Sequence, residues 1–255
     1  MIKIIPWPPF VIAGLRSGIA FFVILLYDRP KSINFGKYTI LGGIFYTVMV
    51  ICFIIANKLT SAGNVILIQY AAPLYVAIFS FIFLGEKLNR YDWLTIIILL
   101  IGLLLFFFEK LSFNQILGNI FAIFSGFGFA GTILLLRKQK NSRPLDSILI
   151  GNFLTLFICF PFFYDGLTSD TMAWIGIFYL GIIQLGLTYC LYSNAIKYVS
   201  ALDASIYTII EPISSPILAY IVLEETMTKN SLIGGIIILV VVLLRAIVKD
   251  KIFKK

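Results

Sequence analysis

Long apolar runs separated by short polar links make up almost the whole chain. We predict spanning segments at residues 9–27, 38–56, 64–84, 91–109, 117–136, 147–164, 173–195, 203–223 and 231–248. Each is close to the ~20 residues that a helix needs to cross a hydrocarbon core roughly 30 Å thick. The runs do not alternate in polarity as barrel strands do, and a spanning backbone must satisfy its own hydrogen bonds. The pattern therefore predicts an all-α, polytopic bundle of nine transmembrane helices.

The composition agrees with this pattern and excludes several functions. Hydrophobic residues make up 60% of the chain and charged residues 13%, where a soluble domain carries about 25% charged residues. Cys52, Cys159 and Cys190 lie in apolar runs without a CxxC spacing, and histidine is absent, so no metal site and no cofactor are expected. Without histidine there is no Ser-His pair, and no HExxH, GxGD or DDxxD motif occurs. We therefore predict that the protein is not an enzyme.

The net charge of +8 is explained by topology rather than by nucleic-acid binding. Its basic residues lie in short loops between apolar runs and do not form one solvated face, so no nucleic-acid partner is expected. One set of loops and ends holds fifteen lysines and arginines, and the other holds four. Because lysine and arginine are retained on the cytoplasmic side, the C-terminus is predicted in the cytoplasm and the N-terminus outside, in a protein of the cell membrane.

One glycine motif resembles a dinucleotide-binding signature. Gly126, Gly128 and Gly131 spell GxGxxG, but they lie inside an apolar run that no strand precedes. At such a place small residues pack helices together rather than hold a pyrophosphate.

An internal repeat relates two parts of the chain. Residues 56–88 align with residues 195–227 at a constant offset of 139. The matched residues are Ala56, Lys58, Ser61, Ala62, Pro73, Ile82, Leu84 and Glu86 with Ala195, Lys197, Ser200, Ala201, Pro212, Ile221, Leu223 and Glu225. By the charge count the first copy starts outside the membrane and the second inside, and inverted repeats of this kind are typical of secondary transporters. We divide the chain into residues 1–112, with four spans, and residues 113–255, with five.

Three stretches of sequence carry a resemblance to a known family. They are PFVIAGLRSGIAFFVILL, NKLTSAGNVILIQYAAPLYVAIFSFIFLGEKL and AIKYVSALDASIYTIIEPISSPILAYIVLEE. The chain resembles the drug/metabolite transporter superfamily in its EamA-type branch. This resemblance implies ten helices in two inverted halves and the export or exchange of small metabolites, commonly amino acids or drug-like compounds. The chain opens where the family's second helix would begin, so either the start of the protein lies upstream or nine helices suffice.

Glu211 is the strongest candidate for a functional side chain. It lies near the middle of a predicted span and precedes Pro212, which removes a backbone hydrogen bond. An unpaired charge in a span costs at least ~2.5 kcal/mol, so the carboxylate must face a cavity, pair with a cation or stay protonated. It is predicted to bind a proton or a substrate amine, or else to pair structurally with Arg16.

Arg16 is the second candidate, because its charge also lies within a predicted span. Gly14 and Gly18 flank it in a GxxxG spacing that allows close helix contact. Its partner is predicted to be a substrate carboxylate or Glu211, unless the side chain reaches a membrane interface.

Further residues are grouped around these two by spacing and by the repeat. Side chains three or four residues from Glu211, and those that precede the first proline of the repeat, are placed near the same level of the membrane. The remaining candidates for binding or coupling are Gln69, Tyr70, Tyr207, Ser214 and Tyr189, and the expected helix breaks are Pro73, Pro212 and Pro216. Polar side chains in spans also serve as bonds between helices, which is the alternative role for each of them.

The sequence thus favours a secondary transporter that exports a small metabolite by alternating access, with protons as a second partner and membrane lipid as its surroundings. The alternative is a membrane scaffold or assembly subunit that transports nothing. A channel is disfavoured, because no filter motif or ring of acidic residues occurs.

Overall fold

Helices account for nearly all of the chain that the structure describes. The computed structural model describes residues 2–3, 5–30, 32–111, 114–164, 169–214 and 228–253. Within these ranges no strand is present. The elements are α1 (Pro9–Asp28), α2 (Lys37–Leu59), α3 (Ala62–Gln69), α4 (Ala72–Leu84), α5 (Arg90–Phe107), η1 (Phe108–Lys110), α6 (Ile116–Lys138), α7 (Pro144–Cys159), η2 (Phe160–Phe163), α8 (Thr171–Tyr179), η3 (Leu180–Leu187), α9 (Thr188–Ala195), α10 (Ala201–Tyr207) and α12 (Lys229–Phe253).

Eight helical segments among the described residues are long and apolar enough to cross a membrane. They correspond to eight of the nine predicted spans, with α3 and α4 together making one of them. The ninth, residues 203–223, is seen only in part, because residues 215–227 lie outside the described ranges. The prediction of a polytopic helical bundle is therefore confirmed.

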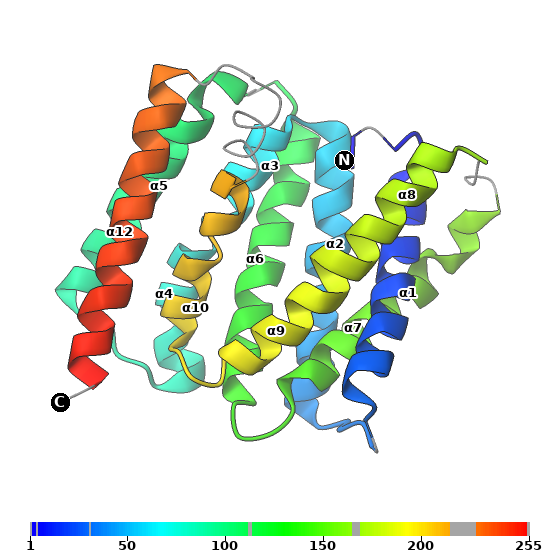
Figure 1. Ribbon diagram of the computed structural model, residues 1–255, viewed down its shortest axis with the longest axis horizontal. Helices are drawn as coiled ribbons and strands as arrows, with labels where there is room; N and C mark the ends of the chain where they lie inside the picture. The colour runs from blue at the N-terminus through cyan, green and yellow to red at the C-terminus, as the bar shows by residue number, and fades with distance from the viewer. Residues whose placement is uncertain are drawn as a thin grey trace.

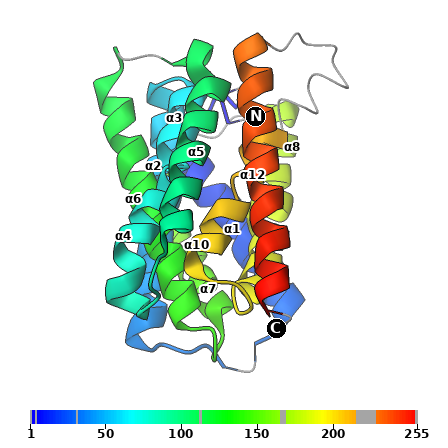
Figure 2. The ribbon, with the colours of Figure 1, turned by 90° about the vertical axis from the view of Figure 1, so that its left-hand side faces the viewer.

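The bundle places the two ends of the chain at opposite ends of the molecule (Figure 1). α2 and α6 lie in the middle, α5 packs beside α12 at one flank, and α1 lies against α7 and η3 at the other (Figures 1 and 2). Large apolar side chains cover the outer surface, for example Phe22, Leu26 and Ile82, which are all more than 60% exposed. Such a surface suits hydrocarbon rather than water as its solvent.

The glycines of the GxGxxG motif pack α6 against other helices. A side-chain carbon on Gly128 would lie 2.7 Å from the backbone nitrogen of Met49 in α2, and one on Gly126 would lie 3.1 Å from the carbonyl oxygen of Ile68 in α3. A side chain at Gly128 would force the backbone of α2 to move, and one at Gly126 would need a smaller shift of α3. The arrangement agrees with the interpretation of the motif as a helix-packing surface.

The contact between α5 and α12 also depends on glycine, and this gives a first testable prediction. A Cβ on Gly234 would lie 2.5 Å from both the carbonyl oxygen of Gly102 and the backbone nitrogen of Phe106. Gly234→Ala must therefore move the two backbones apart, and we expect it to cost ~1–3 kcal/mol, as overpacking does. Thermal unfolding in detergent measures the loss.

Gly235→Ala is the matched control for this experiment. Its Cβ would meet the ring of Phe106 at 3.2 Å, and a ring can yield where a backbone cannot. Equal unfolding midpoints for the two variants would contradict the close approach of α5 and α12 at Gly234.

Candidate functional site

Two broken helices meet inside the bundle, one from each copy of the internal repeat. α3 ends at Gln69, and Tyr70 and Ala71 form a turn before α4, in which Pro73 occupies the first turn. α10 ends at Tyr207, and Thr208 and Ile209 form a turn before a helical stretch over residues 210–214 that contains Pro212. The structure thus places a break beside both prolines. The third expected break, Pro216, lies outside the described residues.

The two broken segments run in opposite directions and begin in the same way. In Figure 1, α3 and α4 descend while α10 rises from the lower end. The hydroxyl of Ser61 accepts from the backbone N–H of Asn64 at 3.1 Å, and that of Ser200 accepts from the N–H of Asp203 at 3.2 Å. Ser61 and Ser200 are separated by the repeat offset of 139, so the repeat preserves the N-cap that starts each broken span.

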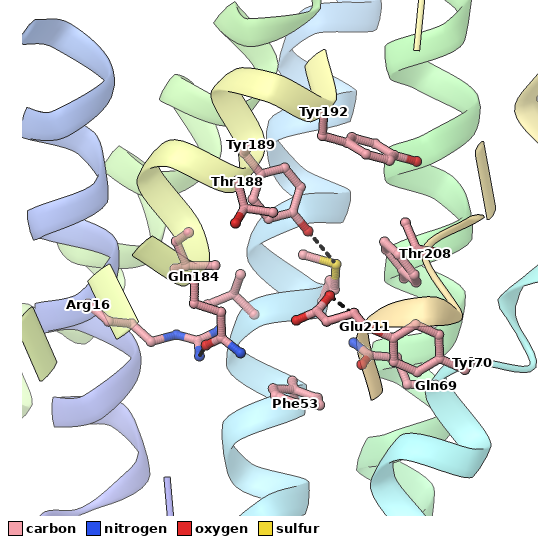
Figure 3. A pocket seen from close by; sticks show the side chains of 14 residues that line it. Arg16, Phe53, Gln69, Tyr70, Gln184, Thr188, Tyr189, Tyr192, Thr208 and Glu211 are labelled. Carbon is pink, nitrogen blue, oxygen red and sulfur yellow. Dashed lines mark hydrogen bonds between the residues drawn. The ribbon is translucent and has the colours of Figure 1, made fainter. Parts of the chain in front are cut away.

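A cavity of about 90 Å³ lies beside these breaks, and side chains from both halves line it (Figure 3). The first half contributes residues from α1, α2 and α3, and the second from α6, η3, α9 and the segment that follows α10. The lining residues are Arg16, Met49, Val50, Phe53, Gln69, Tyr70, Phe129, Gln184, Leu185, Thr188, Tyr189, Tyr192, Thr208 and Glu211. The cavity combines one cation, one carboxylate, several hydrogen-bonding groups and aromatic rings.

Glu211 and Arg16 lie on opposite sides of this cavity, and Gln184 lies beside Arg16 (Figure 3). The Arg16 guanidinium donates through Nη1 to Oε1 of Gln184 at 3.3 Å. Glu211 accepts from the hydroxyl of Tyr70 at 3.1 Å. No direct ion pair joins Arg16 to Glu211 among the described residues, so the two charges remain separate features of the cavity.

Arg16 is almost completely buried yet incompletely paired. Its exposed fraction is 3%, and its Nε has no hydrogen-bond partner among the described residues. Gly181 lets η3 approach α1 closely at this level, because a Cβ there would lie 2.9 Å from the carbonyl oxygen of Arg16 and 2.7 Å from Ile19 Cβ. The predicted close contact at Gly14 and Gly18 is also present, against Cys159 and Leu156 of α7. A buried cation with a free donor is the chemistry that an anionic group would complete.

A π-helix supplies the polar wall on the side of the second half. Residues Leu180–Leu187 form η3, a continuous π-helical stretch between α8 and α9. The wider turn changes the register of the span, so that Gln184 and Tyr189 both face the cavity. Single π-turns occur often at functional sites. Nothing in the apolar run LGIIQLGL predicts this departure from the α-helix.

Aromatic rings complete the lining. Tyr189 packs edge to face on Tyr46, with ring centroids 5.0 Å apart, and lies 6.0 Å from the ring of Tyr192. The hydroxyl of Tyr189 donates to the sulfur of Met49 at 3.6 Å, whereas the buried hydroxyl of Tyr192 has no partner among the described residues. The hydroxyl of Tyr192 can therefore accept or donate a hydrogen bond at an otherwise apolar surface.

Five of the seven residues predicted for the site line the cavity together. They are Arg16, Gln69, Tyr70, Tyr189 and Glu211. Tyr207 and Ser214 do not line it, contrary to expectation. The spacing argument assumed a continuous helix, but the turn at Thr208 and Ile209 changes the direction of the side chains that precede it. The hydroxyl of Ser214 instead donates to the carbonyl of Ile210 at 2.8 Å, within its own helical stretch.

Other polar residues of the spans have structural partners. Asn152 accepts from the hydroxyl of Tyr46 at 3.3 Å, and Asn194 donates to the carbonyl of Cys190. Glu86 pairs with Arg137 at 3.2 Å and accepts from the backbone N–H of Ala201 at 3.1 Å, which caps the start of α10. Phe53 and Thr188 line the cavity without having been singled out, because neither carries a charge or stands beside a proline.

Known proteins resemble the chain over nearly its whole length. A model of the EamA-like transporter family matches residues 1–108 and again residues 116–246. An uncharacterized transporter of Archaeoglobus fulgidus is 30% identical over 234 residues, which cover 90% of this chain and 84% of the relative. The uncharacterized transporter YdfC of Bacillus subtilis is 24% identical over 234 residues, 89% of this chain and 76% of the relative. A protein of known crystal structure superposes with a TM-score of 0.76 over 92% of this chain and 87% of its own, at 17% identity, and shares the fold.

Proposed function

Because this chain belongs to the EamA-like transporter family, we propose that it is a secondary transporter that exports a small metabolite, such as an amino acid or a drug-like compound, across the cytoplasmic membrane. That it is a multi-pass membrane transporter follows from the family and its apolar helices. The proposal adds the kind of substrate, the direction of transport, the coupling to protons and the residues that bind the substrate. The observation that carries it is the cavity that holds a buried arginine and a separate carboxylate between the two halves of the chain.

The mechanism we propose is alternating access. The two halves, residues 1–112 and 113–255, rock about the cavity, with the breaks beside Pro73 and Pro212 as the places where the broken spans change direction. Glu211 binds a proton or the cationic group of the substrate, and Arg16 binds a carboxylate. Tyr70, Tyr189 and Phe53 hold the apolar part of the substrate, since an aromatic face accepts both hydrocarbon and cations.

The free Nε of Arg16 supports the assignment to a carboxylate. A carboxylate can accept two parallel hydrogen bonds from a guanidinium, and such charge-assisted bonds are roughly twice as strong as neutral ones. Gln184 uses only one of the donors of Arg16. A substrate that offers two acceptor oxygens would therefore satisfy the arginine better than the amide does.

The test is transport by the purified chain in proteoliposomes under an imposed pH gradient. Labelled amino acids are compared with amines that lack the carboxylate and with carboxylic acids that lack the amine. We expect the zwitterions to be carried best. Arg16→Gln is expected to slow the zwitterion about ten- to a hundredfold, the factor that a hydrogen bond to a charged group supplies, while the bare amine loses much less.

The controls are Arg16→Lys, which keeps the charge but not the planar fork, and Arg90→Gln, which alters an exposed arginine at the start of α5. If Arg16→Gln slowed transport of the zwitterion and of the amine equally, Arg16 would not bind the carboxylate of the substrate. Absence of transport for every compound, in a chain that inserts and stays monodisperse, would favour the alternative of a scaffold or assembly subunit.

A further inference from the structure

A second hollow lies on the outer face of the bundle, apart from the cavity of the site. It measures about 120 Å³ and is formed by α2, α4 and α6. Its lining consists of Phe45, Phe79, Phe83, Phe127, Ala130, Gly131, Leu134 and Leu135, all of which are apolar, and none of them lines the first cavity. We call it the phenylalanine groove. α2 and α4 belong to the first half of the chain and α6 to the second, so the groove lies at the boundary of the halves.

The shape of the groove comes from ring packing over a glycine. Phe127 is 40% exposed and contacts the rings of Phe45 and Phe79, with centroids 5.7 Å and 6.0 Å away. A Cβ on Gly131 would overlap the ring of Phe45, so the absence of a side chain at this position lets the ring lie over α6. The groove is thus a defined feature of the packing.

One end of the groove carries two ammonium groups. Lys138 lies one turn beyond Leu134 and Leu135 in α6, and its Nζ donates to the carbonyl oxygen of Phe83 at 2.8 Å. The Lys138 and Lys37 ammonium groups also lie over the ring of Tyr38, at 5.9 Å and 5.0 Å from its centroid. All three side chains are exposed, and neither lysine has a carboxylate partner within 4 Å among the described residues.

We propose that the phenylalanine groove and its two lysines form a binding site for an anionic phospholipid. The groove faces the hydrocarbon core of the membrane. There it binds part of one lipid acyl chain between the phenylalanine rings. The helix ends lie at the headgroup level, where tyrosine is typical of the interface and lysine attracts an anionic headgroup. An ammonium has three donors, so Lys138 can bind a lipid phosphate while it keeps its bond to Phe83.

The positive charge near the groove favours an anionic phospholipid over a neutral one. Both lysines lie on the side of the molecule that holds most of the basic residues, the end toward which α6 runs and from which α2 starts. Anionic lipids of the cytoplasmic leaflet face the same side if the topology follows the positive residues. The inference rests on the membrane location of the chain and on the orientation predicted from its basic residues, and it is independent of the substrate proposal.

The experiment is native mass spectrometry of the full chain, released from micelles that contain equal amounts of phosphatidylglycerol and phosphatidylcholine with identical acyl chains. We expect the unmodified protein to retain phosphatidylglycerol preferentially. Lys37→Gln and Lys138→Gln should each lower that retention about fivefold, the effect of one basic residue near an anionic surface. Lys140→Gln, an exposed lysine of the neighbouring loop, should leave it unchanged.

Gly131→Ala tests the acyl part of the site separately. The added carbon must displace the ring of Phe45, and a ring pushed into the groove should lower the retention of both lipids. Equal retention of the two lipids by the unmodified protein, or equal retention by Lys138→Gln and Lys140→Gln, would mean ordinary annular lipid and would overturn the site. Unchanged lipid binding in Gly131→Ala would overturn the placement of the acyl chain.

Discussion

Glu211→Gln is expected to lower transport of the substrate about ten- to hundredfold while the protein inserts and folds normally. Among the described residues the carboxylate is the only acidic group that lines the cavity, where it accepts from the hydroxyl of Tyr70. Glutamine keeps the size and one acceptor oxygen but can neither release a proton nor pair with an amine. Loss of a charge-assisted bond of ~1.5–3 kcal/mol corresponds to about a ten- to hundredfold loss of apparent affinity.

The pH dependence separates the two roles proposed for this carboxylate. If Glu211 carries the coupled proton, Glu211→Gln should lose both net transport and the response to an imposed pH gradient. If it binds only the substrate amine, the variant should still carry a carboxylic acid that lacks an amine, and Arg16→Gln should not. Both rates are measured by uptake of labelled compounds into proteoliposomes.

Glu109→Gln is the matched control for this substitution. Glu109 is exposed, lies in η1 at the end of α5 and contacts Asn230 rather than the cavity. Full transport and an unchanged pH profile in Glu211→Gln, with equal amounts of inserted protein, would remove Glu211 from the mechanism.

Arg245→Met is expected to destabilise the fold more than Gly234→Ala does. The Arg245 side chain is 7% exposed and pairs with two carboxylates, Asp203 through Nε at 2.6 Å and Asp92 through Nη2 at 2.9 Å. The cluster joins α12 to the first turns of α5 and α10. Removing the cation leaves two buried carboxylates close together, and breaking a buried pair in this way costs ~3–5 kcal/mol.

The measurement is the midpoint of thermal unfolding in detergent, followed by the fraction of monodisperse protein. Arg90→Met, which removes an exposed arginine near the same end of α5, should stay close to the unmodified protein. The triple change Arg245→Met, Asp92→Asn and Asp203→Asn should recover much of the loss, because it removes the charges together. A triple variant as unstable as Arg245→Met would contradict the electrostatic origin of the effect.

The spans were readable from the sequence because each depends on a local property. A run of about twenty apolar residues favours the membrane whatever its neighbours are, and the eight long helices fall at the predicted positions. The repeat was also readable, since its signals are single residues at one offset: the N-caps Ser61 and Ser200, and the prolines Pro73 and Pro212. Glu211 and Arg16 were found because a charge within a span is costly wherever it lies.

The sequence showed which charged side chains lie within spans, but it did not show which groups they bind. Arg245 counted only as one of the basic residues that orient the chain, yet it binds carboxylates at residues 92 and 203, both distant in sequence. The sequence suggested that Arg16 and Glu211 could bind each other, but in the structure Arg16 donates to Gln184 and Glu211 accepts from Tyr70. Pairing depends on distances across helices, and no local pattern encodes these.

The sequence by itself therefore determined the membrane class, the helical spans, the repeat and the two charges that need an explanation. All of these follow from transfer free energies and backbone preferences that act residue by residue. Only the tertiary structure decided which polar groups face one cavity. It did so through the turn at Thr208 and Ile209, which turns Tyr207 away, and through the π-helix of η3, which brings in Gln184. The proline at residue 212 predicted the break, but neither the direction in which it turns Tyr207 nor the π-helix follows from periodicity along the chain. Both depend on packing between helices that are distant in sequence, η3 on α1 and α10 on α4.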